Sequence, residues 1–324
     1  MKTKIAIVGA TGLVGRTMVS VLNQRLPKAQ LKLYASPKSA GTNLQFGEQK
    51  IAVVEFKKEK FDFDVDFVLL AAGSSISSEL APLCRQKKVT VIDNSSFWRM
   101  HQDIPLIVPE VNAKALNRHN FIIANPNCST IQSVVAINPL FKTFGVKRII
   151  YNTYQSVSGA GQLAMQLLQS GQKYAHDIIP QIDSFLEDGY TKEEKKMINE
   201  TQKIFDADIA ITATAARVPV FFGHCVSATV ELKSNANLND IIEAFQREKS
   251  ISLMGSNDYP TPKFVQGKDQ VFVGRVRMDT SKKNSVNMWI VADNIRKGAA
   301  TNAVQILQTI LQINQNPGVN YASI

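Results

Sequence analysis

Residues 4–15 read KIAIV followed by GATGLVG, and a run with apolar residues at helical spacing continues from Arg16 to Leu26. A short strand, a glycine turn and a helix in this order are typical of a dinucleotide-binding loop. Gly9 would allow the tight turn, Gly12 the approach of the backbone to a pyrophosphate, and Gly15 close helix–strand packing. The spacing is GxxGxxG rather than GxGxxG, so a purely structural turn is the alternative.

The loop after the next strand bears on the choice of cofactor. Residues 31–34 (LKLY) predict a second strand, and the chain continues ASPKSAG over residues 35–41. An NAD site usually places a carboxylate here to hold the ribose 2′-hydroxyl. This loop offers hydroxyls and a cation instead, which suits the 2′-phosphate of NADP. A solvated polar loop is the alternative.

Further apolar strands are predicted at residues 67–72 and 89–93, and a helix-like segment between them places Cys84 in the core. Strands and helices alternating at this spacing predict an α/β domain of the Rossmann type, with a doubly wound parallel sheet. Residues 94–100 then leave the sheet and carry Arg99 beside aromatic residues. Its guanidinium suits either exposed stacking on these rings or binding of an anionic substrate group.

The segment NPNCST (residues 125–130) lies between an apolar strand at residues 121–124 and a helical run at residues 131–144. Cys128 is therefore predicted at a strand-to-helix junction. Unpaired main-chain N–H groups and the positive end of the helix dipole favour a thiolate there. Cys128 is thus a candidate nucleophile, and a small buried hydrophobe is the alternative for any single cysteine.

The C-terminal half has a different pattern. Its predicted strands cover residues 148–156, 209–220, 225–232, 270–278 and 286–292, with few helices between them. This favours an α+β domain with a mostly antiparallel sheet. The charged segment 190–204 predicts a helix. Its purely structural interpretation is a solvated face with ion pairs between neighbouring turns. A last apolar-periodic helix opens in residues 293–302 and runs to about residue 313.

Three residues of this half can carry chemistry, namely Gln155, Arg217 and His224. Gln155 precedes a small-residue turn, where it can bind a ligand or simply end a strand. Alternation predicts that His224 and Cys225 face opposite sides of their strand, so they do not act together. A proline and a glycine between Arg217 and His224 leave open whether these two share a side.

Composition limits the class of protein. At 324 residues the chain is long enough for two domains. No run approaches the ~18 apolar residues of a membrane span and no secretory cleavage pattern is present, so we expect a cytoplasmic protein without a membrane partner. The net charge of +10 comes from scattered lysines, which predicts phosphate or carboxylate ligands rather than nucleic acid. Three cysteines without ligand-like spacing predict no disulfide framework and no metal site.

Together these motifs resemble those of the aspartate-semialdehyde dehydrogenase family over nearly the whole chain. The matching segments are GATG with Gly15, VPEVN (108–112), NPNCST (125–130), QSVSGAG (155–161), EEKK (193–196), RVPV (217–220) with His224, VGR (273–275) and DNIRKGAA (293–300). The resemblance implies an NADP-binding domain at residues 1–127, a catalytic and dimerisation domain at 128–298, and a C-terminal helix at 299–324 that returns to the first domain.

The resemblance also implies residue roles. Cys128 corresponds to the nucleophile that forms a thioester with the aspartyl group, His224 to the general acid/base, and Gln155 to the residue that orients the acyl group. Arg217 is expected to hold the substrate carboxylate and Glu193 its ammonium group. The expected phosphate-binding residues are Arg99, Asn127 and Lys196. The implied reaction is NADPH-dependent conversion of L-aspartyl 4-phosphate to L-aspartate 4-semialdehyde, a step toward lysine, threonine and methionine.

The expected cofactor contacts are Gly9, Thr11, Gly12, Leu13, Val14, Gly15, Ser36, Lys38, Ser39, Ser158, Gly159 and Asn302. A homodimer is implied, with a tetramer as the alternative. Lys38 stands where many members have arginine, and it keeps the charge but lacks the bidentate fork. Cys225-Val226 and Thr301 also depart from the usual family residues. A reductase of the N-acetyl-glutamyl-phosphate type and a catalytically silent paralogue are the remaining alternatives.

Overall fold

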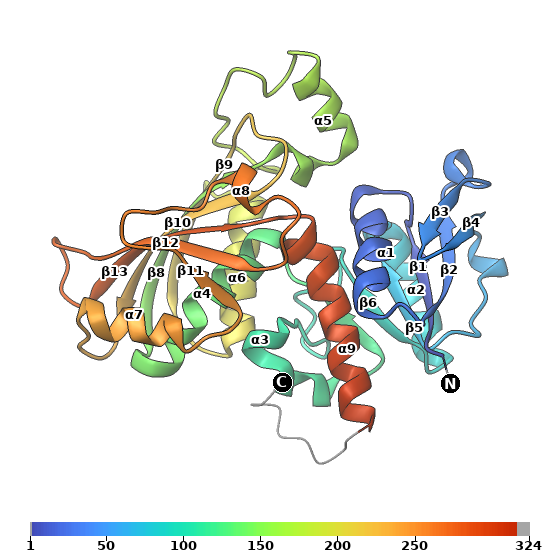
Figure 1. The fold of residues 1–324 in the computed structure, drawn as a ribbon, viewed down its shortest axis with the longest axis horizontal. Helices are drawn as coiled ribbons and strands as arrows, with labels where there is room; N and C mark the ends of the chain where they lie inside the picture. The colour runs from blue at the N-terminus through green and yellow to red at the C-terminus, as the bar shows by residue number, and fades with distance from the viewer. Residues whose placement is uncertain (1, 316–324) are drawn as a thin grey trace. The chain divides into compact units, whose positions relative to one another are not determined.

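The computed structural model describes residues 2–315 and divides into two compact units (Figure 1). One comprises Met1–Pro126 and Ala299–Ile324, and the other Asn127–Gly298. The sequence-based boundary followed Asn127, whereas the structure groups Asn127 with the second unit. The reason is local, because the Asn127 side chain caps the helix that begins at the next residue.

The first unit is built on a seven-stranded sheet of order β3-β4-β2-β1-β5-β6-β7 within the described residues. All neighbouring pairs are parallel except the β3–β4 hairpin. The sheet confirms the predicted Rossmann-type fold class. The sequence analysis did not predict the hairpin. The strand bounds are β1 Lys4–Val8, β2 Gln30–Ala35, β3 Asn43–Phe46, β4 Gln49–Glu55, β5 Phe67–Leu70, β6 Thr90–Asp93 and β7 Ile122–Ala124.

Helices from both ends of the chain complete the core of this unit. The helix after β1 and the last described helix share one cluster of buried apolar side chains with the sheet, including Ile5, Leu22 and Ile306. The helix bounds are α1 Leu13–Arg25, α2 Ser74–Gln86, α3 Pro109–Asn112 and α9 Asn302–Gln315, with 3-10 turns η1 Pro37–Ser39, η2 Lys58–Lys60 and η3 Ala113–Arg118. Helix α9 packs on α1, α3 and β6, so the C-terminal segment belongs to this core.

The second unit contains a six-stranded sheet of order β11-β12-β13-β10-β8-β9 in the described part of the chain. Three neighbouring pairs are antiparallel, while β11–β12 and β8–β9 are parallel. This confirms the predicted mostly antiparallel sheet. The bounds are β8 Val146–Gln155, β9 Ala210–Arg217, β10 His224–Leu232, β11 Ile251–Leu253, β12 Val271–Met278 and β13 Ser285–Ala292.

Helix α4 covers one face of this sheet. It runs from Cys128 to Phe144, is apolar on most sides, and packs on β8, β10, β12 and β13. Alternation along β8 turns Tyr151 and Gln155 to the buried face and Tyr154 to the exposed one. The other helices are α5 Gln162–Gln169, α6 Lys192–Phe205, α7 Leu238–Gln246 and α8 Pro262–Val265, with η4 Val157–Ala160 and a π-helix at Arg296–Thr301.

Among residues 2–315, no helix has both the length and the apolar character needed to span a bilayer.

Candidate active site

Cys128 is the first residue of α4. Asn127 precedes it as the helix cap, and its Oδ1 accepts hydrogen bonds from the N–H groups of Ser129 (2.9 Å) and Thr130 (3.3 Å). The thiol is only half-buried. Because the first-turn amides and the helix dipole favour an anion at this end, the position suits a thiolate.

The other two cysteines lack these features. Cys84 is fully buried in α2, and burial raises the pKa of its thiol to about 12. Burial likewise raises the pKa of Cys225 to about 12. Cys225 packs in an apolar cluster with Val265 and Phe272, on the opposite side of β10 from the polar groups around His224. The prediction that these neighbours face opposite sides is thus confirmed.

Gly298 lies next to the side chain of Cys128, where a larger residue would not fit. A Cβ added to Gly298 in the π-helix would lie 2.8 Å from the Cys128 Cβ and 3.2 Å from its Cα. Real Cβ atoms essentially never come this close to another carbon. Gly298 therefore leaves the space in which the Cys128 side chain sits.

Helix α6 holds the start of α4 through two carboxylates. The main-chain N–H of Asn127 donates to Glu200 Oε2 (2.6 Å), and its side-chain Nδ2 donates to Glu193 Oε1 (2.8 Å). Both glutamates are buried, so the solvated-face interpretation of this helix is wrong for them. Buried carboxylates require such hydrogen-bond partners. Here both donors belong to Asn127, the residue before Cys128.

Glu193 also gathers two other predicted site residues. Gln155 Nε2 donates to Glu193 Oε1 (3.1 Å), and Lys196 Nζ donates to Oε2 (3.3 Å) and to Asp183 (3.0 Å). Burial lowers the pKa of Lys196, but the negative charges of Glu193 and Asp183 outweigh it and the net shift is upward. Lys196 is therefore a stable cation beside a buried carboxylate.

Arg217 lies at the end of β9, in parallel register with Gln155 at the end of β8. Its Nη1 donates to the carbonyl of Ser156 (2.8 Å). Burial lowers the pKa of the guanidinium, while the negative charges of Cys128 and Glu193 act in the opposite direction. Arg217 therefore interacts electrostatically with both Cys128 and Glu193 within the second unit.

His224 completes this group at the start of β10. Its ring is fully buried, and its Nδ1 accepts a hydrogen bond from the Ser156 N–H (3.0 Å). A Cβ at Gly159 would lie 3.1 Å from His224 Nε2 and 3.0 Å from Arg217 Nη1. The sequence left open whether Arg217 and His224 converge, and the structure shows that they do, over Gly159. The neighbouring Ser158 bonds Asn294 and Ser156.

The first unit carries the predicted nucleotide loop, between β1 and α1. A Cβ on Gly9 would lie 2.4 Å from the Ala71 carbonyl oxygen, and one on Gly15 would lie 2.2 Å from the Gly9 carbonyl oxygen. No side chain caps α1 at Gly12, so its first amides face outward from the cap. These features fit a backbone cradle for phosphates. The loop continues with Thr11, Leu13 and Val14, which are partly buried.

The remaining predicted residues of the first unit have the following surroundings. Ser36 and Lys38 are exposed around η1 and Ser39 is half-buried. Arg99 is buried, and it donates to the carbonyls of Asn125 (3.0 Å) and Asn94 (2.9 Å). Asn302 is fully buried and donates to the Ile107 carbonyl (2.9 Å) and Asn125 Oδ1 (2.7 Å). The ligand roles of these residues stay predictions.

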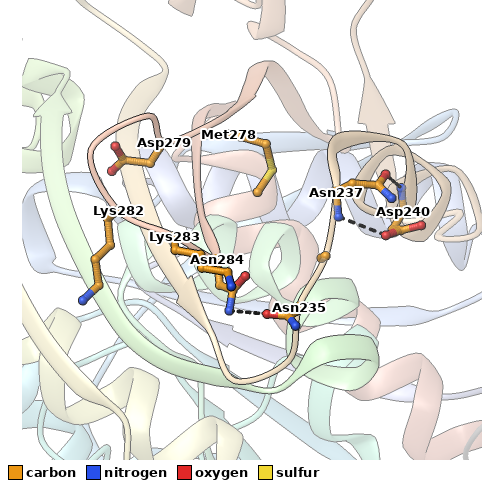
Figure 2. A pocket seen from close by; sticks show the side chains of 9 residues that line it. Asn235, Asn237, Asp240, Met278, Asp279, Lys282, Lys283 and Asn284 are labelled. Atoms are coloured by element: carbon orange, nitrogen blue, oxygen red, sulfur yellow. Dashed lines mark hydrogen bonds between the residues drawn. The ribbon is translucent and has the colours of Figure 1, made fainter.

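The second unit also has a surface hollow that is separate from the residues around Cys128. Figure 2 shows it beside the β12–β13 turn, where Asn284 donates to Asn235 Oδ1 (2.8 Å) and the Asn237 N–H donates to Asp240 (2.9 Å). None of the predicted site residues lines it. In residues 2–315, no cluster of three metal-ligating side chains is present.

Sequence reasoning did not assign roles to Glu200, Asn294 and Gly298. The last two lie inside the quoted segment DNIRKGAA, but the partners of Asn294 lie 71 to 138 residues away along the chain, and Gly298 contacts Cys128. Glu200 falls on the helix read as charged. In each case only the tertiary contact reveals the role.

The chain is similar in sequence and in fold to known proteins. A family model described as "Semialdehyde dehydrogenase, NAD binding domain" matches residues 4–119, and one described as "Semialdehyde dehydrogenase, dimerisation domain" matches residues 137–297. The aspartate-semialdehyde dehydrogenase of Aquifex aeolicus is 44% identical, over 96% of this chain and 99% of that protein. The crystal structure of aspartate semialdehyde dehydrogenase II of Vibrio cholerae complexed with ASA aligns with a TM-score of 0.93 at 42% identity, covering 96% of this chain and 99% of that one.

Proposed function

The chain belongs to the aspartate-semialdehyde dehydrogenase family, and from this membership we propose that Cys128 is the nucleophile that takes up the aspartyl group of L-aspartyl 4-phosphate. The observation that carries the proposal is the placement of Cys128 at the capped N-terminus of α4, within the electrostatic reach of Arg217. A thiolate needs no strong base to attack an acyl phosphate. The products are phosphate and L-aspartate 4-semialdehyde.

The groups around Cys128 divide the substrate between them. Arg217 holds the α-carboxylate through its paired N–H donors, since a buried guanidinium favours a carboxylate partner. Glu193 accepts from the α-ammonium group, and Gln155, which already donates to Glu193, orients the acyl group. His224 presents its Nε2 edge over Gly159. Phosphate binding is assigned to Lys196, Asn127 and Arg99.

Two bond changes at Cys128 follow from this arrangement. The thiolate attacks the acyl carbon, the C–S bond forms, and the phosphate leaves with the electron pair of the broken C–O bond, so the aspartyl group remains on Cys128 as a thioester. A nicotinamide cofactor, when bound, would supply the hydride for the acyl carbon, and the C–S bond would break to release the aldehyde and return the Cys128 thiolate. The residues around Cys128 hold the acyl group while the hydride is transferred.

We assign the cofactor as NADP. The glycine loop fits a dinucleotide, because no side chain caps the first amides of α1 at Gly12, where a pyrophosphate would bind. No carboxylate follows β2 in the chain, where Ser36, Lys38 and Ser39 stand instead. Glu55 is beside Ala35 in the β2–β4 register, but it is ion-paired with Lys57 at 2.9 Å. The 2′-phosphate therefore meets hydroxyls and a cation.

We also assign a homodimer that forms through the open face of the second sheet, in a cytoplasmic enzyme. The matched dimerisation model spans most of this unit. On β8 the face turned away from α4 carries Asn152 and Tyr154, both exposed, and Tyr154 packs against Trp289 of β13 at 5.6 Å between ring centroids. A large sheet with one helix-covered face can bury the other against a second copy. A tetramer is the alternative, and sedimentation at several concentrations distinguishes the two.

The test measures reduction of NADP by aspartate semialdehyde with and without phosphate. We expect turnover of aspartate semialdehyde that requires phosphate. The turnover of N-acetyl-glutamate semialdehyde should be much lower. Mass spectrometry after adding aspartyl phosphate without NADPH should find one aspartyl group on Cys128. An adduct on Cys84 or Cys225, or turnover that does not need phosphate, would refute the proposal. A catalytically silent protein would give neither signal.

A further inference from the structure

Lys196 Nζ lies between two carboxylates from different parts of the second unit. It donates to Glu193 Oε2 at 3.3 Å, three residues earlier on α6, and to Asp183 Oδ2 at 3.0 Å. The side chains are 7% exposed for Glu193, 26% for Lys196 and 39% for Asp183. The bond to Asp183 is thus the shorter and the more exposed of the two, and the proposed function has so far given Asp183 no role.

Two acceptors fix an ammonium group in a way that one acceptor cannot. The lysine ammonium has three N–H donors on a flexible four-carbon stem. A single acceptor lets the group rotate about the hydrogen bond and lets the stem swing. When Glu193 and Asp183 are both bound, the direction of the third N–H of Lys196 is set. Among the described residues no third acceptor for Lys196 is present, so this donor is available to an anionic ligand.

The main chain around Asp183 is held on both sides. Asp183 has a φ of 68°, in the left-handed region that few residues other than glycine adopt and that Asp and Asn tolerate best. On one side Ile179 pairs with Arg217 through two main-chain hydrogen bonds of 2.9 and 2.8 Å. On the other side the Ser184 carbonyl accepts from the N–H of Lys192, the first residue of α6, at 2.9 Å. An uncommon backbone conformation that its neighbours hold in place points to a role for the side chain.

The Asp183 carboxylate is itself oriented and charged. Its Oδ1 accepts from the N–H of Ser184 at 2.9 Å, which leaves Oδ2 for Lys196. Burial alone would raise the pKa of this carboxyl, but the hydrogen bonds from Lys196 and Ser184 outweigh it and the net shift is downward. The group is therefore ionised at neutral pH. Because partly exposed ion pairs contribute little to the stability of a fold, its main effect is on the position of Lys196.

Glu193 alone cannot keep Lys196 in place once substrate binds. A carboxylate offers about four lone-pair sites, two on each oxygen. Glu193 Oε1 already accepts from Asn127 and from Gln155, so the substrate ammonium group must share Oε2 with Lys196. Two ammonium groups on one oxygen repel each other. A second carboxylate is needed to hold Lys196 against that repulsion, and Asp183 supplies it.

We propose that Asp183 is a positioning residue of the phosphate site, which keeps the Lys196 ammonium directed at phosphate while Glu193 receives the ammonium group of the substrate. This rests on the proposed function, in which Lys196 binds phosphate and Glu193 binds the α-ammonium group. Asp183 acts through Lys196 and takes no part in bond making or breaking. Its loss should therefore weaken the binding of phosphate more than it slows the chemical steps at Cys128.

The test measures the KM for inorganic phosphate while the full-length enzyme oxidises aspartate semialdehyde with NADP. Asp183→Gly removes the carboxylate without straining the backbone, since glycine adopts a positive φ freely. We expect the KM for phosphate to rise by about 10-fold, the order expected for one lost hydrogen bond to a charged group. The kcat at saturating phosphate and the melting temperature should change little. An unchanged KM overturns the proposal, and so does a lower KM, which would mean that Asp183 competes with phosphate for Lys196.

Two further variants frame this result. Asp183→Asn keeps one oxygen that can accept from Lys196, but it loses the charge and cannot also accept from Ser184. Its KM for phosphate should lie between those of the wild type and Asp183→Gly. Asp206→Gly is the matched control, because Asp206 is exposed, has a positive φ of 49° and caps the far end of the same helix. Its KM for phosphate should equal that of the wild type, and a rise as large as that of Asp183→Gly would overturn the proposal.

A double-mutant cycle separates a positioning role from a merely structural one. Lys196→Ala removes the group that Asp183 positions and should raise the KM for phosphate by itself. In that background Asp183→Gly should have no further effect, because the two residues act as one unit. If the two effects multiplied, Asp183 would act independently of Lys196 and the proposal would be overturned. If Lys196→Ala left the KM for phosphate unchanged, the assignment of Lys196 would fail and the proposal with it, whereas the thioester on Cys128, measured separately by mass spectrometry, would stand.

Discussion

Replacing Gly298 by alanine tests how tightly the nucleophile is placed. The new Cβ would lie 2.8 Å from the Cys128 Cβ. Carbon atoms in contact prefer about 3.5–4.0 Å, so Cys128 or the π-helix must move by about 0.7–1.2 Å. A displacement of about 1 Å at a reacting group costs about 10²-fold in rate, which is about 2.7 kcal/mol of activation free energy.

The assay is kcat for phosphate-dependent oxidation of aspartate semialdehyde, together with the rate of alkylation of Cys128 by iodoacetamide. We expect kcat of Gly298→Ala to fall by about 10²-fold. The melting temperature should fall modestly, because overpacking a well-filled site costs about 1–3 kcal/mol. The affinity for NADP should change little, because the glycine loop belongs to the other unit.

Gly255→Ala is the matched control. Gly255 is exposed, has no positive φ, and its added Cβ would meet only the Asp258 side chain, with Oδ2 at 3.3 Å and Cγ at 4.0 Å. Its kcat and alkylation rate should equal those of the wild type. If Gly298→Ala also kept both, the placement of Cys128 would not depend on the absence of a side chain at residue 298, and the reasoning would be refuted.

Three further predictions concern other residues. Lys38→Glu should raise the Kd of NADPH far more than that of NADH, because it places a carboxylate where the 2′-phosphate is assigned, and equal losses would contradict the NADP assignment. Arg217→Lys should raise KM for aspartate semialdehyde with less effect on KM for phosphate, since lysine keeps the charge without the fork, and the reverse pattern would mean that the two anion sites are exchanged. Iodoacetamide at about pH 8 should label Cys128 first, because burial raises the pKa of Cys84 and Cys225 to about 12 and keeps them as thiols. Bound substrate should protect Cys128 from the label. Cys128→Ser should lose nearly all turnover.

The nucleotide domain could be predicted from sequence because its signals are local. Residues 4–26 combine strand, glycine turn and helix in one stretch, and the structure forms β1 and α1 there. The β3–β4 hairpin was missed although its signal is present, since Leu44, Phe46, Ile51 and Val53 alternate around Gly47. The sequence analysis expected the helical run to begin at residue 131 and did not predict the cap at Asn127, although its bonds to the amides two and three residues ahead are local.

The environment of the site residues could not be predicted in the same way. Glu193 lies in a run of charged residues that is typical of a solvated helix face, and its burial is explained by its partners Asn127, Gln155 and Lys196. His224 Nδ1 accepts a hydrogen bond from a peptide N–H 68 residues away along the chain. Contacts of this kind arise from the register of sheet strands and the packing of helices, and no single stretch of sequence records them.

The parallel register of β8 and β9 places Gln155 opposite Arg217. Residues 156–209 connect the two strands and include η4 and α6, which carry site residues, but the exposed stretch 170–173 can change in length without shifting the β8–β9 ladder. A single residue inserted within β9 has the opposite effect, because side chains alternate between faces and Arg217 would turn away from the helix-covered side. A short insertion in the exposed stretch 170–173 should therefore leave activity nearly unchanged, whereas insertion of one residue in β9 should abolish it.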